Sequence, residues 1–130
     1  MKAKIFLADD HPALVEAALA ILKHDYDIVG IATDGAMLVS EALRLRPDLI
    51  VSDIILPILN GIEAIHHLRF SNSQAKVVFL TVHAEEGLLM ACMAEGASGY
   101  VLKSLMKTQL IPAIEAALEG KSYVSPFLAK

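Results

Sequence analysis

Acidic residues, a threonine and a lysine stand at the ends of short apolar runs of this sequence. Asp9 and Asp10 follow the first run, Asp53 follows the third, Thr81 ends the fourth and Lys103 follows the fifth. Neighbouring carboxylates repel one another, and Mg²⁺, which prefers oxygen ligands, relieves that repulsion. An ammonium and a hydroxyl suit the oxygens of a phosphoryl group, and a carboxylate can form a covalent aspartyl phosphate. If one fold gathers these side chains, their chemistry is phosphoryl transfer to an aspartate.

The apolar runs have the pattern of strands that are buried on both faces. They are continuous stretches rich in β-branched and other apolar residues, without alternating polar side chains. The segments between them repeat apolar side chains at the three- and four-residue spacing of amphipathic helices. The runs are Ile5–Ala8, Ile28–Ala32, Leu49–Val51, Val77–Leu80 and Tyr100–Leu102.

Strands that alternate with helices predict a parallel sheet covered by helices on both faces. Five such units predict an α/β fold of the flavodoxin-like type, a (βα)5 doubly wound five-stranded parallel sheet in the order 2-1-3-4-5. Such sheets bind ligands at the carboxyl ends of strands 1 and 3, where the order reverses. Residues 1–122 are expected to form this domain, and residues 123–130 a C-terminal tail or the start of a linker.

Residues typical of helix ends mark the boundaries of the predicted helices. Pro12 suits the first turn after the first strand, and Asp34 suits the N-cap of the second helix. Gly96 and Gly120 follow the fourth and fifth helices, where a residue with positive φ is common.

Length, charge and cysteine content exclude several classes of protein. The 130 residues fit one domain, and a net charge of −4 without a basic block argues against direct nucleic-acid binding. The apolar runs are far shorter than the about 20 residues of a membrane span. Cys92 is the single cysteine, so the chain can form no internal disulfide or cysteine zinc cluster. With no signal-peptide pattern at the start, we expect a soluble cytoplasmic protein without membrane contact.

Four segments at the ends of the predicted strands resemble one known family. In this order, they are similar to motifs of the receiver domains of two-component response regulators, most of all to the LuxR-type (NarL/FixJ-like) subgroup. The resemblance covers about Lys4 to Gly120. The segments are Leu7–Pro12, Asp53–Gly61, Leu80–His83 and Gly96–Ser104.

The resemblance implies a phosphoacceptor and a metal site. Asp53 would accept a phosphoryl group from a phosphohistidine of a sensor histidine kinase, with Mg²⁺ as cofactor. The metal ligands would be Asp9, Asp10, Asp53 and the backbone carbonyl of Ile55, with Asp9 acting directly or through water.

The same resemblance implies roles for residues of the last two strands. Thr81 would hydrogen-bond the phosphoryl group and Lys103 would pair with it, so both act with Asp53 in catalysis. Tyr100 matches a switch aromatic that turns inward as Thr81 moves, which changes the surface of the fourth helix, fifth strand and fifth helix. Many such domains have a cis-proline after the lysine; Ser104 stands there, and we expect a trans bond.

The leading hypothesis is a phosphorylation-dependent signalling module rather than an enzyme, with only self-phosphorylation and self-dephosphorylation chemistry. We expect it to form a homodimer on activation and to control a helix-turn-helix transcription domain that this sequence does not contain. Any contact with DNA would then be made by that missing domain. A free-standing receiver that acts through protein contacts is the alternative.

Particular residues argue against three further classes of protein. A Mg²⁺-dependent aspartyl-phosphate phosphatase usually has a second acid where Ile55 stands. A flavin or nucleotide carrier needs a phosphate-binding loop after the first strand, but Asp9–Pro12 is acidic and would repel phosphate without a metal. A receiver-like domain that only dimerises would not need Asp53, Thr81 and Lys103 together.

Overall fold

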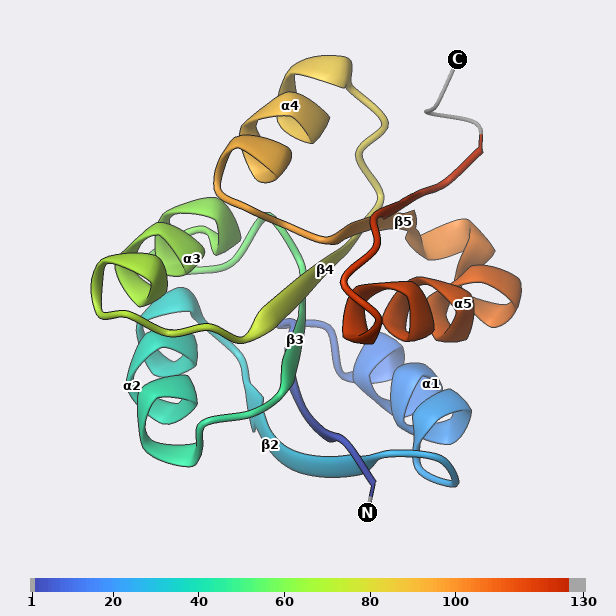
Figure 1. Cartoon of the computed structure of the whole chain (residues 1–130), viewed down its shortest axis with the longest axis horizontal. Helices are drawn as coiled ribbons and strands as arrows, with labels where there is room; N and C mark the ends of the chain where they lie inside the picture. The colour runs from blue at the N-terminus through green and yellow to red at the C-terminus, as the bar shows by residue number, and fades with distance from the viewer. Residues whose placement is uncertain (1, 127–130) are drawn as a thin grey trace.

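The structure is a computed structural model, and it describes residues 2–126 of the chain. Its described residues form one parallel sheet with helices on both faces (Figure 1). The strands lie in the order β2-β1-β3-β4-β5-β6, and every neighbouring pair is parallel. They are β1 (Lys4–Ala8), β2 (Asp27–Ala32), β3 (Leu49–Ser52), β4 (Lys76–Thr81), β5 (Gly99–Leu102) and β6 (Tyr123–Val124).

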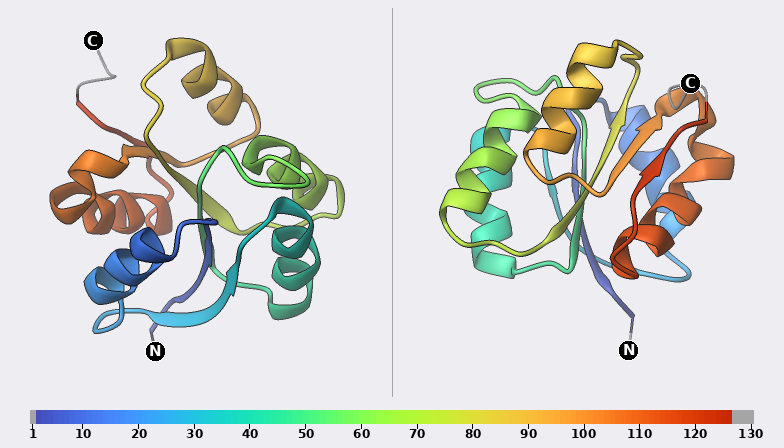
Figure 2. Two further views of the ribbon diagram at one scale, coloured as in Figure 1. Left: turned by 180° about the vertical axis from the view of Figure 1, so that it is seen from behind. Right: turned by 45° about the horizontal axis from the view of Figure 1, so that its top comes forward.

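Five α-helices connect the strands and cover the sheet in two layers. Helices α1 and α5 pack on one face, and α2, α3 and α4 pack on the other, as the views in Figure 2 show. None of the described helices has the length and apolarity needed to cross a membrane. The helices are α1 (Pro12–Leu22), α2 (Gly35–Leu45), α3 (Gly61–Phe70), α4 (Glu86–Ala94) and α5 (Met106–Leu118), with a 3-10 turn at Lys103–Leu105.

Four of the five predicted apolar runs become strands whose apolar residues are buried on both faces. The prediction is wrong for β2, which lies at the edge of the sheet, is only partly buried and has an exposed Ile31. In β1, Ile5 and Leu7 pack in the cluster under α1 and α5, whereas Phe6 and Ala8 pack in the cluster under α2, α3 and α4. Successive side chains of a strand point to opposite faces, so a sheet between two helical layers requires an apolar residue at every position.

The predicted fold is confirmed, and the structure adds a strand to it. The flavodoxin-like arrangement and the order 2-1-3-4-5 are as expected. The additional strand, β6, lies in the segment expected to be a tail and extends the sheet beyond β5. Its two residues are too few for a recognisable pattern, and pairing defines it: Tyr123 N donates to Ser98 O at 2.9 Å, and Ser125 N donates to Tyr100 O at 3.0 Å.

The helix boundaries also agree with the sequence signals. The Asp34 side chain accepts a hydrogen bond from Met37 N at 2.7 Å and caps α2, while Pro12 begins α1. Gly96 and Gly120, which follow α4 and α5, have φ values of 83° and 79°. Only glycine adopts this region at little energetic cost.

Gly61 allows the loop after β3 to close tightly over the end of that strand. Its N–H donates to Ile54 O at 2.6 Å, and a Cβ at this position would overlap with the backbone carbonyl of Asp53. Gly61, the first residue of α3, therefore shapes the backbone beside Asp53, because a residue with a side chain does not fit there.

Replacement of Gly61 by alanine should destabilise the fold. The clash with the Asp53 carbonyl should lower the free energy of unfolding by about 1–3 kcal/mol, as overpacking does. Gly87→Ala in α4 is the matched control: nothing lies near its Cβ position, and alanine should stabilise the helix by up to about 1 kcal/mol. Urea unfolding of both variants checks this, and equal stabilities for the two would contradict it.

Candidate functional site

The parallel sheet gathers the predicted acidic residues at one edge. Asp9 and Asp10 follow β1, Asp53 follows β3, and these strands are neighbours. The three aspartates and His11 each offer one potential ligand atom, and these atoms all lie within 4.8 Å of one another. Asp9 and Asp53 are buried, whereas Asp10 and His11 are exposed, so the group opens to solvent on one side.

Lys103 joins the acids of the two strands. Its Nζ donates to Asp53 Oδ2 at 2.9 Å and lies 2.9 Å from Asp9 Oδ2. The second contact lacks hydrogen-bond geometry, so this buried oxygen of Asp9 accepts no hydrogen bond from the described residues. Burial opposes the charge on Lys103, but the hydrogen bond to Asp53 and the negative charges of Asp53 and Asp9 outweigh it and raise the pKa of the ammonium.

The Asp53 carboxylate is fixed at both of its oxygens. While Oδ2 meets Lys103, Oδ1 accepts a hydrogen bond from Ile54 N at 2.7 Å. The backbone beneath is held as well, because Asp53 N donates to Ala8 O at 2.9 Å and Ser52 Oγ donates to Asp53 O at 2.8 Å. Such restraint fixes the orientation in which the carboxylate meets a reactant.

His11 is a member of the group that the sequence analysis did not include among the site residues. Its Nδ1 lies 2.8 Å from Asp9 Oδ1 and 3.1 Å from Asp10 Oδ1. His11 N also donates to Asp9 Oδ1 at 2.9 Å. The available signal was its place directly after the two aspartates at the start of α1, where the backbone turns back on the preceding residues.

Thr81 and Tyr100 both contact the backbone of His83. Thr81 is fully buried at the end of β4, and its Oγ1 accepts a hydrogen bond from His83 N at 3.3 Å. Tyr100 is also fully buried, and its hydroxyl donates to His83 O at 2.7 Å. Burial is the main reason why the pKa of Tyr100 is raised. The side chain is thus already turned inward, while its coupled movement with Thr81 remains a prediction.

The other predicted site positions lie at the same edge of the sheet. Thr81 is paired with Leu102, which directly precedes Lys103, so the hydroxyl and the ammonium come from adjacent strands. Ile55 lies in the loop after Asp53 with an exposed side chain, and the role of its carbonyl as a metal ligand remains a prediction. The bond between Lys103 and Ser104 is trans, as expected.

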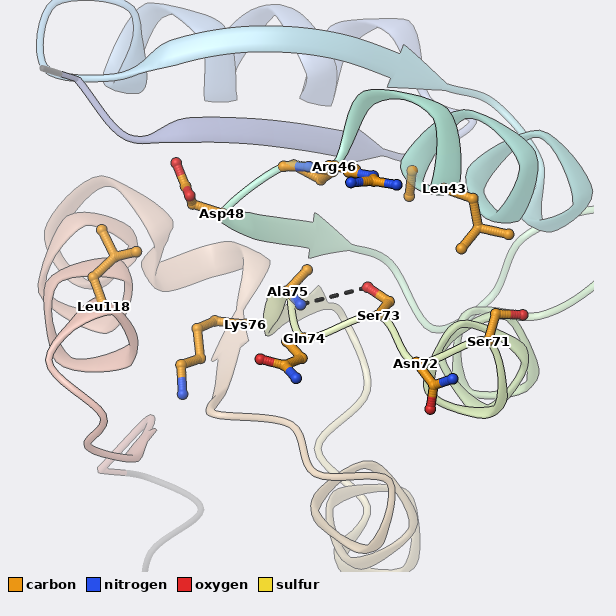
Figure 3. A pocket seen from close by; sticks show the side chains of 12 residues that line it. Leu43, Arg46, Asp48, Ser71, Asn72, Ser73, Gln74, Ala75, Lys76 and Leu118 are labelled. Atoms are coloured by element: carbon orange, nitrogen blue, oxygen red, sulfur yellow. Dashed lines mark hydrogen bonds between the residues drawn. The ribbon is translucent and has the colours of Figure 1, made fainter.

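A separate hollow of about 690 Å³ lies at the opposite end of the sheet. Figure 3 shows that Asp48 and Lys76 line it, together with Arg46 and the segment Ser71–Ala75. Asp48 precedes β3 and Lys76 begins β4, so this hollow opens at the amino ends of strands whose carboxyl ends carry the acidic group. It is therefore not part of the candidate site.

Sequence comparison identifies the family. Residues 5–115 match the model of the response regulator receiver domain, and the chain belongs to this family of two-component signalling proteins. It is 32% identical over 127 residues to the transcriptional regulatory protein DegU of Brevibacillus brevis, covering 96% of this chain and 54% of DegU. It is 33% identical over 128 residues to the nitrate/nitrite response regulator NarL of Escherichia coli K12, covering 97% and 59%. The chain thus spans little more than half of these relatives.

Solved structures agree with this assignment. A LuxR-family two-component response regulator from Aurantimonas sp. SI85-9A1 superposes with a TM-score of 0.93 and 34% identity, over 99% of this chain and 94% of that one. The signal receiver domain of the putative regulator NarL from Mycobacterium tuberculosis, at 24% identity, shares the fold with a TM-score of 0.88 over 92% and 98%. The resemblance to LuxR-type receivers is confirmed by these relatives.

The raised pKa of Lys103 predicts how stability depends on pH. Its contribution is fully present below the ordinary lysine pKa of about 10.4 and is lost as the pH rises through its higher pKa in the folded protein. As the pH rises above about 10, the free energy of unfolding should fall more steeply for the wild type than for Lys103→Met. Urea unfolding at several pH values measures this. Lys107→Met, which removes an exposed lysine of α5, should keep the wild-type slope; parallel curves for all three proteins would contradict the prediction.

Proposed function

We propose that Asp53 accepts a phosphoryl group from a phosphohistidine of a sensor histidine kinase, and that this modification switches the domain. The observation that carries the proposal is the position of the Asp53 carboxylate. It lies at the end of β3, is fixed at both oxygens, and has an ammonium on one side and a group of acidic oxygens on the other. A carboxylate held in this way can act as the nucleophile of phosphoryl transfer.

The donor set fits Mg²⁺ as the cofactor of this reaction. Hard divalent cations prefer oxygen ligands, and Asp9, Asp10 and Asp53 supply carboxylates within 4.8 Å of one another. Asp9 also has the buried oxygen that accepts no hydrogen bond in the described residues. These aspartates, with the carbonyl of Ile55, would hold the ion, which would neutralise charge on the transferred group.

Lys103 and Thr81 are proposed to bind the oxygens of the phosphoryl group. The Lys103 ammonium already contacts Asp53 Oδ2, so it lies beside the atom to which phosphorus would be joined. Charge-assisted hydrogen bonds are among the stronger ones that proteins form. Thr81 would exchange the hydrogen bond that it accepts from His83 N for one to the phosphoryl group. Tyr100 would follow through its own bond to the carbonyl of the same residue, His83.

The product would be a signal rather than a released compound. The family acts mainly in signalling, and its matched members DegU and NarL are named as regulators. The position two residues after Asp53 carries the exposed apolar side chain of Ile55, which cannot supply the second acid of a phosphatase. Self-phosphorylation and self-dephosphorylation are therefore the whole proposed chemistry.

The proposed output is control of transcription in the cytoplasm. The receiver would be residues 1–122 together with the short strand β6, and the residues after β6 would lead toward a helix-turn-helix domain that binds DNA. The switched surface would be formed by α4, β5 and α5, and activation would favour a homodimer. Leu89, Met90 and Met93 of α4 supply apolar side chains to this region, and Met90 is 64% exposed.

Phosphorylation of Asp53 can be tested on this chain directly. Incubation with acetyl phosphate and Mg²⁺ should add one phosphoryl group to the wild type and none to Asp53→Asn, as intact mass spectrometry would record. Asp34→Asn is the matched control: it replaces an acid that follows β2 at the same edge, and asparagine caps α2 equally well. Equal labelling of Asp53→Asn and the wild type would refute the proposal.

Removal of the metal gives a second prediction. Mg²⁺ at 100 times its dissociation constant should raise the free energy of unfolding by about 2.7 kcal/mol, and EDTA should reverse this and stop labelling. Asp10→Asn should weaken Mg²⁺ binding because it removes one carboxylate ligand, whereas Asp34→Asn should not. Urea unfolding with and without Mg²⁺ measures both effects, and unchanged Mg²⁺ binding in Asp10→Asn would contradict the assigned ligand set.

A further inference from the structure

Ser125, directly after β6, is a fully buried polar residue with three hydrogen bonds. Its N–H donates to Tyr100 O at 3.0 Å, and its hydroxyl oxygen accepts from Leu102 N at 3.2 Å. The hydroxyl itself donates to Gln109 Oε1 of α5 at 2.6 Å. Figures 1 and 2 show the C-terminal segment, in red, running beside β5 in this region. One buried oxygen atom thus connects β6, β5 and α5.

The two partners of the Ser125 hydroxyl stand on either side of the turn that carries Lys103. Leu102 is the last residue of β5, the 3-10 turn occupies Lys103–Leu105, and Gln109 lies in the first turns of α5. The hydroxyl therefore bridges the entry and the exit of this turn. Lys103, at the start of the turn, reaches back to Asp53 and Asp9.

Among the described residues, the other side-chain hydrogen bonds at this turn are those of Lys103 Nζ to Asp53 Oδ2 and of Thr108 Oγ1 to Leu105 O, the latter at 3.3 Å. Leu102, which precedes the 3-10 turn, and Leu105, which precedes α5, make no side-chain capping hydrogen bond. Fixing the backbone of each residue in a turn has an entropic cost of about 1–2 kcal/mol, so an unanchored turn samples more conformations. Of these contacts, the bridge through Ser125 is the one that connects Leu102, before the turn, to Gln109 of α5.

Burial of a serine is unfavourable unless its hydroxyl is hydrogen-bonded, and a small apolar residue could fill the same space. The hydroxyl is explained by what it holds on β5 and α5.

We propose that Ser125, together with Gln109, is a positioning residue that clamps the Lys103 turn and thereby links the C-terminal strand to the site at Asp53. The proposal rests on the proposed function in one respect, namely that Lys103 binds the phosphoryl group. The link is reciprocal: whatever fixes Lys103 at Asp53 favours the paired form of β6, and release of β6 loosens Lys103.

Two pairs of variants isolate the clamp. Ser125→Ala removes the hydroxyl but keeps the backbone bond to Tyr100, and Ser122→Ala makes the same change at an exposed serine before β6. Gln109→Met removes the acceptor at similar length, whereas Gln109→Glu keeps a carboxyl oxygen in its place. The Gln109 pair leaves Ser125 itself intact, so it decides the matter even where Ser125→Ala weakens the pairing of β6.

The first measurement needs no phosphoryl group. In NMR spectra of the unliganded chain, the Cε and Hε signals of Lys103 should shift in Ser125→Ala and Gln109→Met and stay in place in Ser122→Ala and Gln109→Glu. Amide exchange of Leu102 should become at least tenfold faster in the first two variants. Unchanged Lys103 signals in Ser125→Ala and Gln109→Met would overturn the clamp, whatever their melting temperatures.

The second measurement uses beryllofluoride with Mg²⁺, a mimic of the aspartyl phosphate. Ser125→Ala and Gln109→Met should bind it about three- to tenfold more weakly, while their affinity for Mg²⁺ alone stays within twofold of the wild type, because Lys103 is not a metal ligand. Loss of both affinities together would indicate a merely structural role and overturn the proposal. If the wild type itself fails to bind the mimic, the function proposed for Asp53 is wrong, and the Lys103 signals still decide the clamp.

Discussion

The contact on which the rest of the site depends joins one ammonium to carboxylates from two neighbouring strands. Lys103 Nζ lies 2.9 Å from an oxygen of Asp53 and 2.9 Å from an oxygen of Asp9. Such a contact requires β1 and β3 to be adjacent and parallel, because only then do their carboxyl ends meet at one edge. It also requires β5, which lies beyond β4, to end in a turn from which the Lys103 side chain reaches back to Asp53 and Asp9.

This contact leaves an imbalance of charge that explains the chemistry of the site. Three carboxylates face a single lysine, which leaves an excess of two negative charges among these four side chains. One divalent cation would balance that excess. The proposed phosphoryl group would add further negative charge at Asp53, which cations beside it would have to balance. Under the proposed function, residues that repel phosphate in isolation would become a phosphoryl site once a cation is shared among them.

The parts of this arrangement that depend on local sequence could be predicted, and the parts that depend on tertiary pairing could not. Continuous apolar runs identified five strands because a strand buried on both faces needs an apolar residue at each position. The parallel topology then placed Asp9, Asp53 and Lys103 together. Strand β6 has two residues and exists only through its pairing with β5, and the hydrogen bonds of Ser125 join residues far apart in the chain. His11 belongs to the group through a backbone turn that periodicity does not report.

Strand β5 is the element in which the site and the rest of the molecule meet. The hydroxyl of Tyr100 donates to His83 O in the loop after β4, and its carbonyl accepts from Ser125 N. Lys103 directly follows the last residue of the same strand. Under the proposals made above, a change at Asp53 would reach both the surface near α4 and the C-terminal strand through this stretch of backbone. Coupling between sites requires an element with two arrangements that both sites bias. Because β6 is short and is held by few hydrogen bonds, its pairing with β5 is the part of this sheet whose equilibrium a small change at Lys103 can shift most readily.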